Sequence, residues 1–435
     1  MIGKLAFRNL FRNKWRSLLT GGGVAVAVTL LVFTNGFIDG YLDEMIRGAT
    51  SIETGQAQIQ TNSYAEEPKI WKSFPASEEL YERVAAVDGV ESVAPRVEFY
   101  GLVGTERRSQ VSRIVGVDPQ VEGRGSPLRE AVAEGKWFSA RPAEPPAPRE
   151  ALVGIGLARQ IGVGVGDELV VFAEAKDGSL GNELLRVVGL LEAGNTQIDR
   201  QTTFLRLEDA QFVAAMDGEI HELSIRTDRI QRARELAERV GVAAEAWQRE
   251  KMAGMTGFDD GEEKQVELVV RPWQKLVPEL HQIIDLSRSS SWIFYLIIYF
   301  IAALGILNTQ RMSALERHRE FGVMQAIGMS PRRLFATVML ETTLLTMMGA
   351  VVGASLGAAL NLYFAAYGFN MGVFAGGESF SYMGIAFSER IHFAVTLEGI
   401  ATPVVAILPV ALLCGLWPAV STAGLNPAVA VAGRD

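Results

Sequence analysis

The sequence predicts a membrane protein in which four transmembrane α-helices carry one large α+β extracytoplasmic domain, inserted between the first and second helices. The first reason is charge: the 435 residues have a formal net charge of −9, yet residues 39–291 alone hold 29 Lys and Arg against 43 Asp and Glu. The second is the long apolar segments outside this region, and the third is the strand-like and helical patterns inside it. A wholly soluble protein is therefore not expected, and the acidic balance does not suit nucleic-acid binding.

Four segments are long and apolar enough to cross a bilayer, which takes about 20 residues for a core of roughly 30 Å. They cover residues 17–38, 292–310, 334–367 and 393–417. The first segment could also be the core of a cleaved signal peptide. Its length and the three spans that follow favour a retained membrane anchor.

Basic residues flanking the spans predict their orientation. Residues 1–16 hold five Lys and Arg and no acidic side chain, and residues 311–333 hold five arginines. Residues 368–392, in contrast, hold one Lys or Arg, namely Arg390. We therefore expect residues 1–16, 311–333 and 418–435 on the cytoplasmic side. Residues 39–291 and 368–392 are then expected outside.

Residues 1–16 also have a helical period. Phe7, Phe11 and Trp15 recur on one side, and Arg8, Arg12 and Arg16 recur on another. This pattern is typical of an amphipathic helix lying on anionic membrane lipid. A charge cluster that only sets the topology, without a fixed helix, is the alternative.

The acidic region 39–291 predicts an α+β domain with two lobes. Helical patterns occur at 75–87, 204–216 and 229–247, between short strand-like runs. The proline-rich stretch 141–150 is expected to be a linker or extended loop, and the polar stretch 249–271 to be mobile and followed by a helix from about Pro272.

A glycine-rich stretch at 154–169 does not predict a nucleotide site. Its glycines do not match G-x-G-x-x-G at the start of a helix, because a strand pattern follows them. We expect a helix, a turn and a strand with a structural role.

The search for catalytic motifs predicts a non-catalytic chain without cofactor or metal. The four histidines have no metal-ligand spacing, Cys414 stands alone, and the P-loop pattern G-x-x-x-x-G-K-[ST] does not occur. Ser355 lies in a G-x-S-x-G match, but inside a predicted membrane helix instead of a strand–turn–helix corner. Gly349, Gly353 and Gly357 there predict close packing against another span of this chain or a second subunit.

Glu341 is the one acidic residue in the third predicted span. Ionisable residues at membrane depth usually have a function. The alternative is a side chain at the cytoplasmic interface, paired with Arg332 or Arg333. Both interpretations remain open at this stage.

The segment between the second and third spans combines charge with exposed apolar residues. Gly328 is expected to end a short helix, Ser330 to cap the next one and Pro331 to occupy its first position. Such a helix either binds a cytosolic partner or packs on its own bundle. The candidate coupling residues are Glu316, Arg317, Glu320, Phe321, Gly322, Val323, Ala326, Ile327, Gly328 and Met329.

These residues resemble the signature of the MacB/FtsX-type ABC transporter permeases, E-R-x-x-E-(F/I)-G-(V/I)-x-x-A-(I/L)-G, at every position. Residues 417–433 resemble the ending of the same family, although Val431 stands where leucine is common. The runs at 87–97, 156–171 and 187–211 resemble the periplasmic domain of the LolC/LolE lipoprotein-releasing permeases.

The resemblance implies a subunit of the bacterial inner membrane with one span, a porter-and-sabre-type periplasmic core, and then three spans. Residues 17–38 and 292–435 would form the FtsX-like permease unit. It also implies mechanotransmission, in which a cytosolic ABC ATPase dimer pushes the coupling residues and the second span carries the movement outward. ATP and Mg²⁺ would bind that ATPase, expected to be a separate polypeptide because only 16 residues precede the first span.

The implied partners are a second permease subunit, identical or LolC/LolE-like, a lipoprotein cargo and a periplasmic chaperone. Two other functions remain open on the sequence. One is MacB-like efflux of a hydrophobic peptide or antibiotic, and the other is an FtsX-like signal relay that activates a cell-wall hydrolase.

Overall fold

The computed structural model describes residues 14–143, 146–227, 230–251, 256–259, 262–371, 381–382, 385–386 and 390–425. The predicted amphipathic helix at 1–16 and tail at 418–435 therefore lie mostly outside the described residues. The chain forms two compact units. We call residues 1–43, 284–373 and 390–435 the membrane unit, and residues 44–283 with 374–389 the globular unit.

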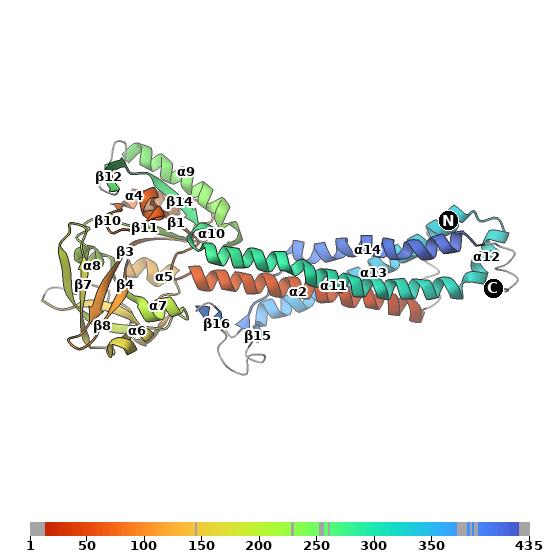
Figure 1. Cartoon of the computed structure of the whole chain (residues 1–435), viewed down its shortest axis with the longest axis horizontal. Coiled ribbons are helices and arrows are strands. Elements are labelled where there is room, and N and C mark those ends of the chain that lie inside the picture. Colours follow the sequence, from red (N-terminus) through yellow and green to blue (C-terminus); the bar gives the residue numbers. More distant parts are fainter. Residues whose placement is uncertain are drawn as a thin grey trace. The chain divides into compact units, whose positions relative to one another are not determined.

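Four helices are long and apolar enough to cross a membrane: α2 (Lys14–Thr50), α11 (Pro278–Glu316), α13 (Pro331–Tyr367) and α14 (Leu397–Ala423) (Figure 1). Two of them continue well past the predicted spans, α2 beyond residue 38 and α11 before residue 292. The reason is that the flanking polar residues are also compatible with a helix, whereas hydropathy marks only the apolar part. Helix α14 begins four residues later than predicted, because the Thr396 side chain caps it by accepting the Gly399 N–H at 3.0 Å.

The glycines of α13 pack against α2 of the same chain. A Cβ added to Gly349 would lie 2.5 Å from the Gly21 carbonyl oxygen, and one added to Gly353 would lie 2.4 Å from the Ala25 carbonyl oxygen. The Thr29 hydroxyl donates to the Gly353 carbonyl at 3.1 Å. This close approach places the three predicted packing glycines, Gly357 included, at an intramolecular contact.

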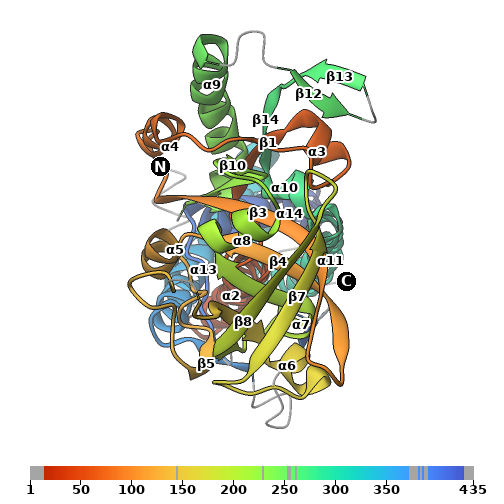
Figure 2. The same cartoon turned by 90° about the vertical axis from the view of Figure 1, so that its left-hand side faces the viewer.

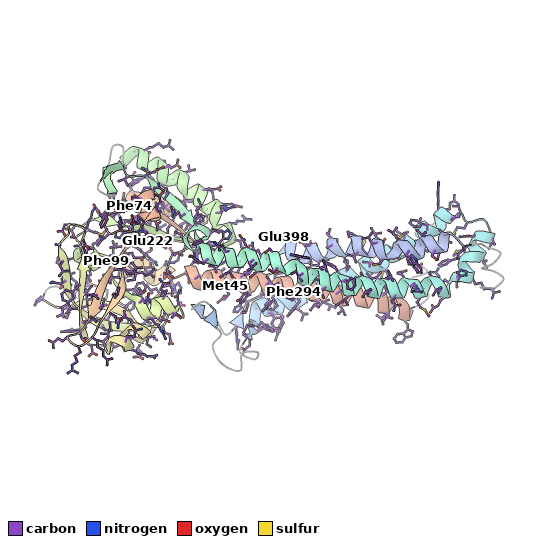
Figure 3. The ribbon with its side chains drawn as sticks, viewed as in Figure 1. Met45, Phe74, Phe99, Glu222, Phe294 and Glu398 are labelled. Atoms are coloured by element: carbon purple, nitrogen blue, oxygen red, sulfur yellow. The ribbon has the colours of Figure 1, made fainter. Side chains whose placement is uncertain are left out.

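Aromatic rings gather where α2 and α13 meet the segment before α14. Phe393 lies 5.1–5.8 Å, between ring centroids, from Phe33, Phe37, Phe364 and Phe369. The Ala394 N–H donates to the Gly36 carbonyl at 3.0 Å. Short strands β15 (Phe369–Asn370) and β18 (Arg390–Ile391) pair beside this cluster, and β16 (Ser381–Tyr382) pairs with β17 (Ile385–Ala386). Phe294 on α11, by contrast, is exposed (Figure 3).

The globular unit is built on one ten-stranded mixed sheet (Figure 2). Along the sheet the strands are ordered β14-β1-β11-β3-β4-β9-β6-β8-β5, and β7 pairs with β3 and β8. The strands are β1 (Ala57–Thr61), β3 (Ser92–Gly104), β4 (Ser109–Val117), β5 (Val132–Gly135), β6 (Arg149–Gly154), β7 (Glu168–Glu174), β8 (Leu180–Leu191), β9 (Thr202–Arg206), β11 (Glu222–Arg226) and β14 (Leu268–Pro272).

Helices and two short strand pairs complete this unit. They are α3 (Asn62–Glu66), α4 (Glu78–Ala85), α5 (Pro119–Gly125), α6 (Ile155–Ile161), α7 (Thr196–Gln201), α8 (Leu207–Val213), the 3-10 helix η1 (Ile230–Arg232), α9 (Ala233–Lys251), α10 (Trp273–Leu276), and the pairs β2 (Phe74–Pro75) with β10 (Glu219–Ile220) and β12 (Thr256–Asp259) with β13 (Glu262–Gln265). Alternate residues such as Ile59 and Leu223 face a core shared with α4 and α9, which includes Phe74 and Phe99 (Figure 3).

The glycine-rich stretch at 154–169 forms the expected helix, turn and strand, namely α6, Gly162 with φ +84°, and β7. The stretch expected to be mobile at 249–271 instead contains β14. Its partner is β1, with Ala57 opposite Pro272. A strand that forms by pairing with residues about 200 positions away gives little local signal.

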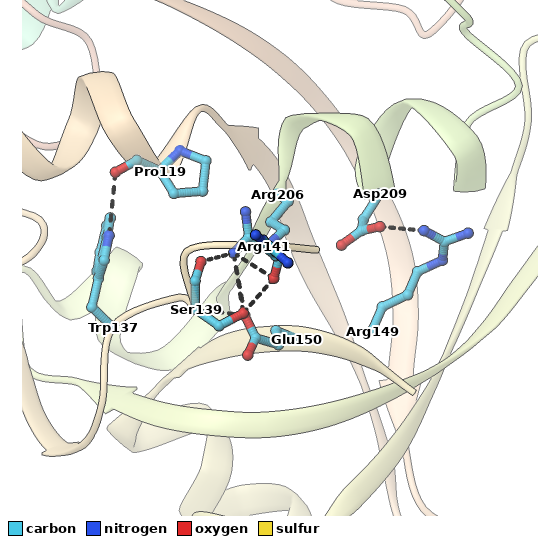
Figure 4. Close-up of polar contacts among 8 residues, drawn as sticks. All are labelled: Pro119, Trp137, Ser139, Arg141, Arg149, Glu150, Arg206 and Asp209. Carbon is cyan, nitrogen blue, oxygen red and sulfur yellow. Dashed lines mark hydrogen bonds and ion pairs between the residues drawn. The ribbon is translucent and has the colours of Figure 1, made fainter. Parts of the chain in front are cut away.

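The residues before the proline-rich stretch and Glu150 at its end are held by hydrogen bonds that involve α5, β6 and β9 (Figure 4). The Trp137 indole N–H donates to the Pro119 carbonyl at 3.3 Å, and the Ser139 N–H donates to a Glu150 carboxylate oxygen at 2.8 Å. The Arg206 guanidinium donates to the Ser139 carbonyl. Residues 137–139 and 150 are therefore fixed, while residues 144–145 lie outside the described part.

A buried ion network fastens the end of α2 into the globular unit. Glu122 on α5 accepts from Arg96 at 2.6 Å and from Arg226 at 2.7 Å, and all three side chains are almost fully buried. Arg96 also donates to the Glu53 carbonyl at 2.5 Å, and Arg226 to the Ser51 carbonyl at 3.2 Å. Because residues 51–53 directly follow α2, these bonds tie the helix end to β3 and β11.

Changing Gly353 to alanine should destabilise the membrane unit. The added Cβ would meet backbone at 2.4 Å, and such overpacking costs about 1–3 kcal/mol. The measurement is thermal unfolding of the full chain in detergent. Gly305→Ala on α11 is the matched control, because its Cβ would meet nothing within 4 Å. Equal melting temperatures for the two variants would contradict the close contact.

Changing Glu122 to glutamine should leave two buried arginines without their carboxylate. Breaking one side of a buried ion pair costs about 3–5 kcal/mol, or about 6–20 °C in the Tm of a unit of this size. The matched control is Glu168→Gln, whose pair with Arg186 is about half exposed and should contribute no more than about 1 kcal/mol.

The same pair gives a pH dependence. Burial alone would raise the pKa of Glu122, but the charges of Arg96 and Arg226 outweigh it and lower that pKa from 4.5. The stability from this ion pair is therefore complete above pH 4.5 and is lost as the pH falls through the lowered pKa. An acid unfolding curve with the same midpoint for the wild-type chain and Glu122→Gln would refute it.

Candidate functional site

The predicted coupling residues lie at a helical joint between α11 and α13. Helix α11 ends at Glu316, Arg317 departs from helical geometry with φ −99° and ψ 10°, and α12 follows at His318–Ala326. The backbone bonds from the Arg317 N–H to Ser313 and from the Phe321 N–H to Arg317 continue across the joint. Helix α12 is therefore a short continuation of α11 with a changed direction.

Gly328 ends α12 with a Schellman motif. Its φ is +103°, its N–H bonds to the Gln325 carbonyl, and the Met329 N–H bonds to the Met324 carbonyl, both at 3.0 Å. The sequence places this stop correctly because a φ in this range favours glycine. Ser330 occupies the predicted cap position of α13, although its side chain makes no capping bond.

One face of α12 packs against α13 and α14. Phe321 is 3% exposed and contacts Leu334 and Val338 of α13 and Ala419 of α14. Met324 and Met329 lie against the same cluster, and Gly322 is buried beside Phe321. The interpretation in which this helix packs on its own bundle therefore holds for this face.

Gln325 makes a contact that sequence reasoning missed. Its side-chain amide donates to the carbonyls of Thr422 at 3.2 Å and Ala423 at 3.3 Å. These carbonyls belong to the last turn of α14, where helices leave acceptors without intrahelical donors. Gln325 occupies a variable position of the family signature, so the signature does not predict its contact with α14.

Arg317 joins the start of α12 to α13 through Glu341. Its Nη1 donates to both carboxylate oxygens of Glu341, at 3.0 and 2.9 Å. The same guanidinium contacts Glu320 at 3.3 Å and lies 4.9 Å from the ring centroid of Phe321.

The alternative that paired Glu341 with Arg332 or Arg333 was wrong about the partner. These arginines precede Glu341 by nine and eight residues on the same helix, a rise of roughly 12–14 Å. Glu341 bonds instead to Arg317. The change of chain direction between α11 and α12 places Arg317 next to Glu341.

The opposite face of α12 is free of described packing and carries apolar side chains. Ile327 is 82% exposed and Val323 is 39% exposed. Ala326 and Gly328 are exposed beside them, as is Glu316 before the joint. The candidate residues thus divide into an inward set, which fixes α12, and an outward set, which can contact another molecule. We call Val323, Ala326 and Ile327 the docking face.

Among the described residues no group of three or more His, Cys, Asp or Glu side chains could hold a metal ion. Ser355, in the G-x-S-x-G match, donates to the Val351 carbonyl inside α13 at 2.8 Å. Around α12 the described residues thus form a helix end that is packed on one face and carries exposed apolar side chains on the other.

Comparison with known proteins covers both units. The family model for a MacB-like periplasmic core domain matches residues 17–242, and that for an FtsX-like permease C-terminal matches residues 292–427. A lipoprotein-releasing system transmembrane protein LolC of Xylella fastidiosa is 24% identical over 78% of this chain and 75% of its own length. LolE of Haemophilus influenzae is 22% identical over 78% and 76%.

A further relative and a solved structure also match. An uncharacterized ABC transporter permease of Methanocaldococcus jannaschii is 22% identical over 84% of this chain and 85% of its own length. The periplasmic region of MacB from Actinobacillus actinomycetemcomitans is 12% identical, covers 55% of this chain and 98% of that structure, and has a TM-score of 0.35. Since one family model alone matches more than half of the residues, the chain belongs to the MacB/FtsX-type ABC transporter permeases, as a multi-pass membrane protein with a MacB-like core domain and an FtsX-like permease domain.

Proposed function

We propose that this chain is the permease subunit of an ABC transporter that releases lipoproteins from the bacterial inner membrane toward a periplasmic carrier. The observation that carries the proposal is the similarity of most of the chain to permeases named as lipoprotein-releasing LolC and LolE, at 21–24% identity. Family membership implies a partner ATPase and a second permease subunit, identical to this chain or related to it.

The proposed orientation puts both termini and α12 in the cytoplasm and the globular unit in the periplasm. It is supported by the basic residues before the first span and by the arginines at 311–333. The docking face of α12 would then be available to a cytosolic ATPase. ATP and Mg²⁺ would bind that ATPase, while this chain contributes no catalytic group.

The proposed mechanism is mechanotransmission. Closure of the ATPase dimer pushes α12, and helices that reach the globular unit change its shape so that a bound lipoprotein leaves the membrane. The support for it is physical: α12 is short, its inward face is packed and its outward face is apolar. A helix fixed on one side transmits a push, whereas a flexible loop would absorb it.

Changing Ile327 to aspartate should weaken ATPase binding without unfolding the chain. Ile327 is 82% exposed, so folding loses little, but a charge in an apolar interface core costs about 2 kcal/mol, or roughly 30-fold in Kd. The measurement is the amount of ATPase that co-purifies with the permease. Val242→Asp on α9, also exposed at 70%, is the matched control, and equal ATPase recovery from both variants would sink the docking role.

Depletion of this chain should leave outer-membrane lipoproteins in the inner membrane. The reason is that a lipoprotein's acyl chains leave a bilayer slowly without work, at about 0.8 kcal/mol for each buried CH₂. The measurement is membrane fractionation after depletion, with complementation by the wild-type chain or by Ile327→Asp.

The wild-type chain should restore sorting and Ile327→Asp should not. Normal sorting combined with sensitivity to hydrophobic antibiotics would favour efflux instead. Normal sorting combined with a division defect would favour a signal relay.

A further inference from the structure

We propose that the ion pair between Arg317 and Glu341 makes α12 and α13 one rigid body, so that a push on α12 moves α13 and, through it, α2. This inference rests on the proposed function for the source of the push. It gives Glu341 a positioning role inside the permease and changes the expected route, which ran through the second span, α11.

The geometry of the pair supports a fixed joint. One guanidinium nitrogen donates to both oxygens of Glu341 at 3.0 and 2.9 Å, while the side chains are 9% and 17% exposed. Charge-assisted hydrogen bonds of this kind are short and orient both groups. The contact of the same arginine with Glu320 is longer, at 3.3 Å, and Glu320 is 41% exposed. Glu341 is therefore the partner that holds Arg317 in place.

The location of the pair decides which helices it joins. Arg317 is the residue at which α11 gives way to α12, and Glu341 lies on α13 between the Phe321 cluster and the glycine contact. Phe321 and Gln325 add contacts from α12 to α13 and α14. The described packing of α12 thus includes contacts to both α13 and α14.

The remaining step leads from α13 to α2. Gly349 and Gly353 bring the two backbones into contact, and Thr29 bonds across it. In the most apolar stretch of each helix, 39% of residues are buried in α2 and 33% in α13, but only 17% in α11. Because α2 and α13 are joined backbone to backbone and α11 contacts the same core through side chains such as Ala302 and Ile306, the route through α13 and α2 is the stiffer one.

Spin-label distances in the complete complex with its ATPase test this proposal without any cargo. In a Cys414→Ser background, one pair of labels is placed at Arg319→Cys on α12 and Leu356→Cys on α13. A second pair is placed at Arg319→Cys and Leu304→Cys on α11. Labelled chains are diluted with unlabelled ones so that each complex holds one labelled copy, and distances are measured without nucleotide and with ATP and vanadate.

In the otherwise unchanged chain we expect the α12–α13 distance to stay constant and the α12–α11 distance to shift on nucleotide binding. In Glu341→Gln the α12–α13 distance should change with nucleotide, while the ATPase still co-purifies in full. Exchange of the charges, Arg317→Glu with Glu341→Arg, should restore the constant distance. Arg311→Gln is the matched control, since this arginine's described contact is with the Trp417 ring, 5.5 Å away.

Several results would overturn the proposal. The first is an α12–α13 distance that changes with nucleotide in the unchanged chain. The second is an α12–α13 distance that stays constant in Glu341→Gln. The third is a charge-exchanged chain in which the α12–α13 distance still changes with nucleotide. Loss of ATPase co-purification in Glu341→Gln would show that the ion pair only keeps the docking face folded, which would also contradict the proposal. If neither distance responds to nucleotide in the unchanged chain, both this inference and the proposed docking fail, whereas a different cargo would leave the distances as expected.

Discussion

The membrane unit depends on the close backbone contact between α2 and α13. Helices in lipid gain little from the hydrophobic effect when they meet, because lipid tails are as apolar as leucine side chains. Association then requires close packing, and Gly349, Gly353 and Gly357 supply it because they place no side chain of α13 at the crossing. The buried residues Val24, Val28 and Val32 of α2 fill the remaining space together with residues of α11 and α14. The other helices thus have a fixed pair against which to pack.

Sequence patterns predicted the parts of this fold that depend on neighbouring residues. The apolar spans, the end of α12 at Gly328 and the glycine face of α13 could all be read from local spacing. The partner of Glu341 could not, because the change of direction at Arg317 decides which side chain reaches the carboxylate. Strand β14 could not be predicted either, because it forms by pairing with β1, which is distant in the sequence.

The family signature combines two kinds of residue that the structure separates. Arg317, Phe321 and Gly322 face inward and fix α12 against the bundle, whereas Val323, Ala326 and Ile327 face outward. A substitution in the first set would change the stability of the packing around α12 and, under the proposed mechanism, transmission as well. Under the proposed docking, a substitution in the second set would weaken binding of the ATPase and leave folding unchanged, so the signature by itself does not distinguish a docking defect from a folding defect.

For the proposed transmission, the strand order of the globular unit also favours α2 over α11 as the route. The end of α2 leads into β1, which is bonded to β11 on one side and to β14 on the other. The start of α11 follows β14, an edge strand of the sheet with β1 as its partner. A load applied through β1 is shared by two ladders of hydrogen bonds and by the bonds from Arg96 and Arg226 to residues 51–53. A load applied through β14 is carried by one ladder, by the bond from Arg271 to the Ala65 carbonyl and by the bond from the Leu268 N–H to Gln248. Because β1 has a ladder on each side, it is bonded to more of the sheet than β14 is.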